Sequence, residues 1–181
     1  MNTLSHVLTA IAMLASAVIY GTDVFAAVVL HPALAHVDDE ALTSTMGYVH
    51  DYGDRRLPAP GALGLVAATL GTVAVALAGH AAVTAANATA VGALVVWLIL
   101  YGRVSAPVNR QLTTAAHDGY TLPNVRALQR RWDGVINARA ILQMLALAAL
   151  CAGLSLSRGT SIELEMSHVS PNRCQEGPYD V

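Results

Sequence analysis

Apolar residues are concentrated in long blocks that short polar segments separate. The first block runs from His6 to Ala35, and Asp23 is its only Asp, Glu, Lys or Arg. A second block, from Ala59 to Gly102, contains none of these residues. About 20 apolar residues suffice for a helix to cross a bilayer, so the first block is long enough for one span and the second for two. The pattern therefore predicts a helical membrane protein.

Turn residues and helical periodicity divide these blocks further. Gly79 and His80 form the natural turn within the second block, and apolar residues at helical spacing resume near Asn124. We predict an all-α fold, an integral membrane four-helix bundle that forms a single domain over residues 1–157. Its spans are expected at about 4–34, 61–78, 83–101 and 135–157. Pro32 favours an end of the first span nearby, because a proline disfavours helix in the residue before it.

The segments outside the spans have two different characters. Between spans one and two, Ala41 to Arg56 carries Leu42, Met46 and Val49 at helical spacing, which predicts a short amphipathic helix that Thr43 or Ser44 could start. Residues 158–181 are polar and contain Gly, Pro and Ser, so we predict a disordered tail.

Composition supports a membrane location. Only 12% of the residues are charged, about half the usual share of a soluble domain, and the net charge of −2 gives no sign of nucleic-acid binding. The expected partner is the lipid bilayer. A cleaved signal peptide normally begins with a positively charged segment, but residues 1–30 contain no Lys or Arg. We therefore expect that the first span is retained.

The distribution of arginine predicts the orientation. Loops 35–60 and 102–134 carry most of the arginines, whereas the N-terminus and the turn after span two carry none. Positive residues favour the cytoplasmic side. We therefore expect a multi-pass protein of the cell membrane, with these two loops in the cytoplasm and both termini outside.

Asp23 is the strongest candidate for function, because a carboxylate at membrane depth costs roughly 3 kcal/mol and normally faces the bundle interior or a wet cavity. Three interpretations compete. Asp23 could form a structural ion pair with Arg139 or Arg103, it could bind a metal, or it could handle a proton or a substrate.

His50 and Asp54 are four residues apart and would share one face of the amphipathic helix. They could form a hydrogen-bonded pair, or they could bind a metal together with Asp23. Imidazole and carboxylate ligands suit iron, manganese or zinc. The sequence leaves open whether there is any metal at all.

Further polar and aromatic residues flank the last two spans. Asn109 and Arg139 are candidates for holding an oxyanion of a substrate. Tyr20, Trp132 and Asn137 are candidates for contacting the substrate itself, although Trp132 could simply anchor the chain at the membrane interface.

Several of these motifs resemble the anthrone oxygenase-like family of small four-span membrane proteins. The resemblance rests on residues 20–25 (YGTDVF), 31–34 (HPAL) and 107–109 (PVN), and on Trp132 with Asn137 and Arg139. Residues 46–50 and 54–58 resemble a bacterial subgroup. The resemblance implies a four-helix membrane bundle and an oxidation of an anthrone to an anthraquinone by molecular oxygen.

Two classes of function follow. The first is an oxidoreductase that acts on a hydrophobic, aromatic or quinone-like small molecule, with Asp23, His50, Asn109 and Arg139 as catalytic residues. The second is a non-enzymatic membrane subunit or helper in which Asp23 and Arg139 form a structural ion pair. A transporter is less favoured, because the spans show no inverted repeat. The sequence leaves open whether copies of the chain form a homo-oligomer.

Overall fold

The computed structural model describes residues 3–169, with side chains as far as Ser157. All regular structure in this range is helical, and no strand occurs in it. The elements in chain order are α1 (Thr3–Phe25), η1 (Ala26–Leu30), α2 (His31–Leu34), α3 (Asp39–Arg56), α4 (Pro58–Leu77), α5 (Ala81–Leu100), η2 (Tyr101–Ser105), α6 (Ala106–Asp118) and α7 (Val125–Val169).

Four stretches of helix are long and apolar enough to cross a membrane: Thr3–Leu34, Pro58–Leu77, Ala81–Asp118 and Val125–Ser157. The predicted all-α fold with four such helices is therefore confirmed. The third and fourth stretches extend well beyond the predicted spans at the end where their sequence becomes polar.

The extensions depend on how two prolines are accommodated. Pro32 and Pro107 each lie just after a five-residue π-helical segment, η1 and η2 respectively. A proline inside an α-helix lacks an N–H group and clashes with the preceding turn, and the wider π turn relieves this conflict. The helices therefore continue through both prolines, whereas the sequence pattern suggested that span one and span three end near them.

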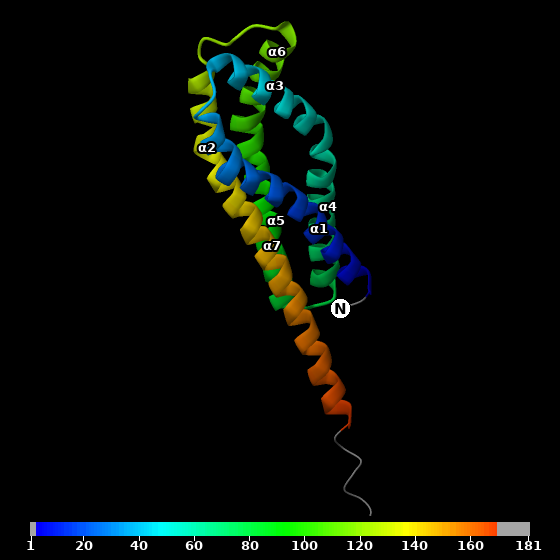
Figure 1. Cartoon of the computed structure of the whole chain (residues 1–181). Coiled ribbons are helices and arrows are strands. Elements are labelled where there is room, and N and C mark those ends of the chain that lie inside the picture. The colour runs from blue at the N-terminus through cyan, green and yellow to red at the C-terminus, as the bar shows by residue number, and fades with distance from the viewer. Residues whose placement is uncertain (1–2, 170–181) are drawn as a thin grey trace, which may run out of the picture.

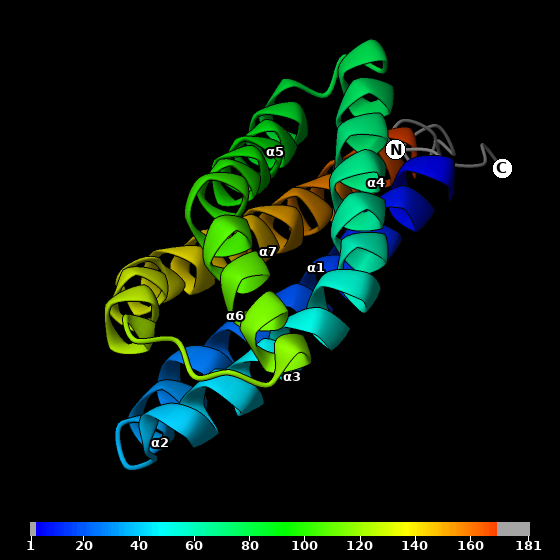
Figure 2. The same ribbon diagram turned by 90° about the horizontal axis from the view of Figure 1, so that it is seen from above.

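The four long helices form a ring in which each packs against two neighbours. α1 packs against α4 and α7, and α5 packs against α4 and α7. The views in Figures 1 and 2 show this arrangement, with α3 and α6 packed against each other at one end. The turn between α4 and α5 lies at the opposite end, where Gly79 has a φ of +77°. The two arginine-rich loops consequently share one end of the bundle.

Small residues bring α1 and α4 close together. Gly64, Ala67, Ala68 and Gly71 are buried on one face of α4, as their spacing predicts. A Cβ atom added at Gly64 would lie 3.1 Å from the Oγ atom of Ser16. Close approach of this kind is the usual basis of helix association in membranes.

The amphipathic helix is present as α3, which begins at Asp39. The Asp38 carboxylate caps it by accepting a hydrogen bond of 2.8 Å from the backbone N–H of Ala41. Thr43 and Ser44 therefore do not start the helix as the sequence suggested. Leu42 and Met46 are buried in a core cluster that also contains Leu112 of α6.

The far end of α7 differs from the sequence expectation. The helix continues past Ser157 as far as Val169, into the segment predicted to be a disordered tail. The remainder of that segment, 170–181, lies outside the described residues.

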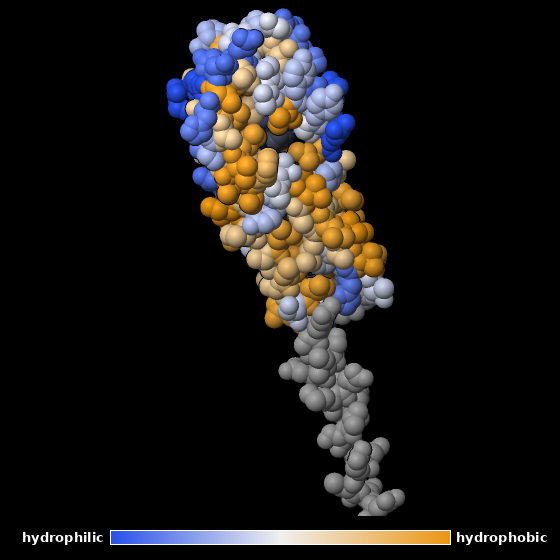
Figure 3. All heavy atoms as spheres, viewed as in Figure 1, coloured by the Kyte–Doolittle hydropathy of each residue, from blue (hydrophilic) through white to orange (hydrophobic). Residues whose placement is uncertain are grey.

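Apolar side chains cover much of the outer surface of the ring. For example, Leu14, Val28 and Leu77 are 73%, 68% and 85% exposed. A soluble protein seldom has so many large apolar groups on its surface. Figure 3 shows a broad hydrophobic band and, above it, a hydrophilic end formed by the region around α3 and α6.

Candidate functional site

A buried ion pair links α1 to α7. Arg139 Nη2 donates to Asp23 Oδ1 at 2.7 Å, and both residues are almost completely buried, at 7% and 2% exposure. Trp97 of α5 completes the environment of the carboxylate, because its Nε1–H donates to Asp23 Oδ2 at 2.7 Å. Of the two arginines considered as partners of Asp23, the structure selects Arg139.

Other groups fix the orientation of the Arg139 guanidinium. Its Nη1 donates to Ser105 Oγ at 2.8 Å, at the end of η2. Its Cζ lies 5.2 Å from the ring centroid of Trp97, 5.5 Å from that of Tyr101 and 5.9 Å from that of Trp132. Aromatic faces attract a cation, and the attraction is stronger where water is excluded. The cation is therefore held in an aromatic cage.

Asp54, at the end of α3, is a second carboxylate close to this pair. Tyr101 OH donates to its Oδ1 at 2.7 Å, and Asn109 Nδ2 donates to the same oxygen at 3.0 Å. These three residues come from α3, η2 and α6. The π-helical segment η2 contributes to both clusters, since Tyr101 begins it and Ser105 ends it.

A cavity of about 340 Å³ lies beside both carboxylates. Asp23, Asp54, Tyr101 and Arg139 form part of its wall, and apolar side chains form most of the rest. The apolar part of the lining comes mainly from Ile19, Leu57, Leu65, Val66, Leu94 and Leu98. Figure 3 shows a hollow, with mostly hydrophobic atoms around it, near the hydrophilic end of the molecule. An apolar chamber with a few convergent polar groups is typical of a small-molecule site.

His50 lies outside the lining of this cavity, although it shares a helix face with Asp54. Its ring packs on Trp132, with 5.5 Å between the ring centroids, and its Nε2 atom has no hydrogen-bond partner. Burial lowers the pKa of His50 from 6.5 to about 4; the Asp54 carboxylate opposes this shift and the Arg139 guanidinium adds to it. The imidazole is consequently neutral at pH 7.

The proposed metal ligands do not come together. Among the residues that the structure describes, no three His, Cys, Asp or Glu side chains are grouped so that they could hold a metal ion. Asp23 is engaged by Arg139 and Trp97, while Tyr101 and Asn109 hold Asp54. This geometry corrects the prediction that His50, Asp54 and Asp23 form a ligand set, and no step proposed below involves a metal.

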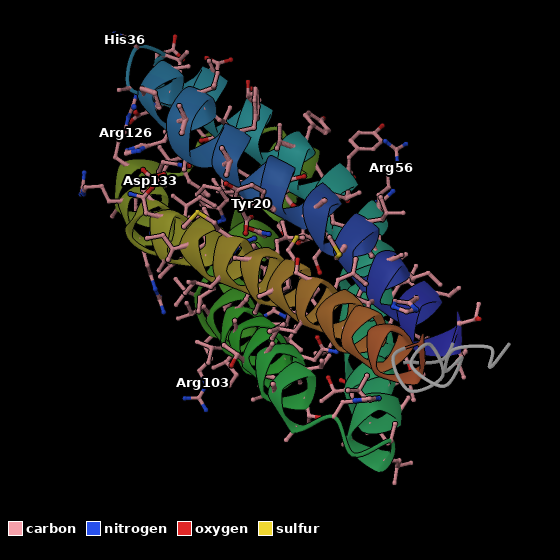
Figure 4. The ribbon with its side chains drawn as sticks, turned by 90° about the horizontal axis from the view of Figure 1, so that it is seen from below. Tyr20, His36, Arg56, Arg103, Arg126 and Asp133 are labelled. Atoms are coloured by element: carbon pink, nitrogen blue, oxygen red, sulfur yellow. The ribbon has the colours of Figure 1, made fainter. Side chains whose placement is uncertain are left out.

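The expected substrate-contacting residues lie apart from the cavity. Asn137 is exposed on α7, and neither Tyr20 nor Trp132 belongs to the cavity lining. Figure 4 shows Tyr20 between α1 and α7 and Arg103 directed away from the bundle. Asn109 is buried and acts on the cavity only through Asp54.

Three important residues were not singled out by the sequence pattern. The positions of Trp97 and Tyr101 near the end of the third predicted span suit interfacial aromatics. In the structure the two rings stack, with 5.8 Å between their centroids, and each residue donates to a carboxylate of the site. Gln143 lines the cavity on the same face of α7 as Arg139, one turn further along. Polar or aromatic residues four apart within a span were the signal that could have found them.

Comparison with protein-family models, with curated proteins and with solved structures finds no match to this chain.

Proposed function

We propose that this chain is a multi-pass integral membrane protein that binds and oxidises a hydrophobic, aromatic or quinone-like small molecule. The observation that carries the proposal is the apolar cavity of about 340 Å³ with two carboxylates and an arginine in its wall. Four apolar helices and an apolar outer surface support the membrane location. An apolar ligand dissolved in the lipid suits a cavity whose lining is mostly apolar.

Oxidation is the reaction that the resemblance to anthrone oxygenases implies. In an anthrone, the methylene group lies between two aromatic rings that are conjugated to the carbonyl group on the opposite side of the central ring. Loss of its proton to a well-placed base is favourable because the negative charge spreads onto the carbonyl oxygen. The resulting carbanion transfers its electrons to molecular oxygen, and the net change converts the methylene and O₂ into a carbonyl group and water. The chain must therefore supply a base and donors that stabilise the enolate oxygen.

The geometry favours Asp54 as that base over Asp23 and His50. Asp54 lines the cavity, and its hydrogen-bond donors, Tyr101 and Asn109, are neutral groups. Asp23 also lines the cavity, but Arg139 donates to its Oδ1 and Trp97 to its Oδ2, at 2.7 Å each, so both oxygens are already held by the groups that pair with it. In this proposal Arg139 holds the substrate oxygen, and Asp23 and Trp97 position Arg139.

A second candidate is the non-enzymatic subunit or helper. It draws support from one specific observation, namely that Asp23 and Arg139 satisfy each other in a buried ion pair. In that case the cavity would have no substrate, and the pair would serve only to hold α1 against α7.

Ligand binding separates the two candidates. The protein is reconstituted into lipid nanodiscs and titrated with anthrone under nitrogen, with quenching of tryptophan fluorescence as the signal, since Trp97 lines the cavity. Gly61→Leu would fill the chamber, because a Cβ atom there meets only Ile19 Cδ1 at 4.0 Å. Gly92→Leu is the matched control: it is also a helical glycine with open space, and it lies outside the cavity lining.

Saturable quenching in wild type and in Gly92→Leu, but not in Gly61→Leu, is the expected result. Admitting air should then produce anthraquinone, and Asp54→Asn should bind anthrone but lose at least about 100-fold in rate, as expected when a general base is removed. Binding without turnover in wild type would reject the oxidase. An identical response of the two glycine variants would reject the cavity as the site.

A further inference from the structure

Two polar groups deep in the cavity have no hydrogen-bond partner. Ser16 Oγ and Gln143 Oε1 are both unpaired, and their residues are only 2% and 1% exposed. Both residues belong to the cavity wall, one from α1 and the other from α7. An unpaired polar atom in an apolar environment typically costs 1–3 kcal/mol, so groups of this kind normally have a partner.

The unpaired state of Ser16 is unusual for this protein. Thr9 and Thr22, on the same helix, each donate to the backbone carbonyl four residues earlier, at 2.9 Å. Thr69 and Thr72 of α4 do the same. A hydroxyl in a membrane helix can satisfy itself in this way without any other partner. Ser16 makes no such bond, although the residue belongs to the cavity wall. Its Oγ atom is enclosed beside Gly64, so a rotation about the Cα–Cβ bond is what would bring it to an occupant.

Ser16 and Gln143 form a second polar group in the cavity wall, which we call the second station. Ser16 precedes Asp23 by seven residues, roughly 10 Å along a helix axis. Gln143 follows Arg139 by four residues, roughly 6 Å along α7. Because α1 and α7 are antiparallel neighbours, both displacements lead in the same direction, toward the end of the bundle that carries the α4–α5 turn.

We propose that Ser16 and Gln143 are specificity-determining residues that bind a second oxygen function of the ligand, at the end opposite to the one held by Arg139. This inference rests on the proposed use of the cavity as a ligand site. The ligand that fits is flat and apolar, with two hydrogen-bonding oxygens separated by about one ring. The side chains of Gln143 and Ser16 can each donate or accept a hydrogen bond, so either a carbonyl or a hydroxyl group of the ligand can bind there.

The test compares two probes that share a bicyclic carbon frame, one with two carbonyl oxygens and the other with one. 1,4-Naphthoquinone has oxygens at opposite edges of one ring, whereas 1-tetralone has the same bicyclic frame with one oxygen. Their dissociation constants are measured by tryptophan quenching in nanodiscs for wild type, Ser16→Ala and Gln143→Leu. Gln129→Leu is the matched control, because Gln129 is a buried glutamine of the same helix that lies outside the cavity lining.

Gln143→Leu and Ser16→Ala should each weaken naphthoquinone binding by about five- to tenfold, the usual effect of one lost hydrogen bond, and leave tetralone binding within about twofold. Gln129→Leu should leave both dissociation constants unchanged. If both probes bind wild type but the two variants lose affinity equally for each, the second station is wrong and the cavity remains a ligand site. If neither probe binds wild type while anthrone does, the second station is again wrong. If none of the three binds, the proposed function fails along with this inference.

Discussion

Arg139 on α7 and Asp23 on α1 are 116 positions apart in the sequence, yet their side chains meet at 2.7 Å inside the bundle. Each residue supplies the opposite charge that lowers the cost of burying the other inside the bundle. Transfer of an isolated charge into an apolar interior is very costly, and a good hydrogen-bonding geometry offsets much of that cost. The pair therefore fixes the rotation of α1 relative to α7, and with it the residues that face the cavity.

Removal of one partner should be far more damaging than removal of both. Asp23→Leu or Arg139→Leu leaves a buried unpaired charge, and each should lower the free energy of unfolding by about 3–5 kcal/mol. The double variant Asp23→Leu/Arg139→Leu should be more stable than either single variant. Reversible unfolding in mixed micelles, followed by circular dichroism, measures all three.

The exposed pair between Arg126 and Asp39 serves as the comparison. These groups lie 2.7 Å apart but are 36% and 52% exposed. Asp39→Leu should therefore cost at most about 1 kcal/mol. Additive effects of the two single substitutions at Asp23 and Arg139 would show that the buried charges are not coupled.

The neutral His50 imidazole predicts a dependence of stability on pH. Its pKa is about 4 in the folded protein and 6.5 in the unfolded chain, so the unfolded chain binds more protons between these values. The contribution is fully present above pH 6.5 and is lost as the pH falls toward 4. The free energy of unfolding should decrease by up to about 1.4 kcal/mol per pH unit in this window.

The variant His50→Phe isolates this contribution, because phenylalanine keeps a ring against Trp132 but cannot bind a proton. Unfolding midpoints are measured for both proteins from pH 7 to pH 4.5. The difference between wild type and variant should shrink or reverse as the pH falls. Parallel curves for the two proteins would contradict the assignment of a buried neutral imidazole.

The helices of this protein could be predicted from its sequence because bilayer thickness sets a clear length for apolar runs. Asp23 and Arg139 stood out for the same reason, since charge is expensive there. The detailed surroundings of Asp23 could not be predicted. Trp97 reaches it from α5, and the helix rotations that bring the two residues together do not follow from spacing alone.

The length of the third helix could not be predicted for a related reason. The third span was expected to end at about residue 101, before Pro107, yet a π-helical segment accommodates this proline and the helix continues to Asp118. That turn places Tyr101 against Asp54 and Ser105 against Arg139. The four-residue spacing of His50 and Asp54 raised a shared metal site with Asp23 as one alternative, whereas Asp54 is held by hydrogen-bond donors from the continued helix.

Gly47 allows α3 to dock closely on α6. A Cβ atom at this position would lie 2.5 Å from the backbone oxygen of Leu112 and even closer to the Ala116 side chain. Gly47→Ala should therefore destabilise the packing of α3 by about 1–3 kcal/mol, the usual cost of overpacking. Hydrogen exchange of α3 amides measures the effect. Gly134→Ala is the control, because Gly134 is a helical glycine with open space around it, and this change should not accelerate exchange in α3. Equal protection of the α3 amides in both variants would contradict the tight contact at Gly47.

The arginine-rich end of the bundle should face the cytoplasm, because seven of the ten arginines lie in the two loops or helix ends gathered there and positive residues are retained on that side. Single cysteines at His36 and at Ala82 test this orientation, since both positions are exposed and lie at opposite ends of the bundle. Cys151→Ser and Cys174→Ser are introduced first, because these are the two native cysteines of the chain. In sealed right-side-out vesicles, a membrane-impermeant maleimide should label Ala82→Cys at once and His36→Cys only after the vesicles are opened. The reverse order would show the opposite orientation, and immediate labelling of both positions would contradict a bundle that spans the membrane.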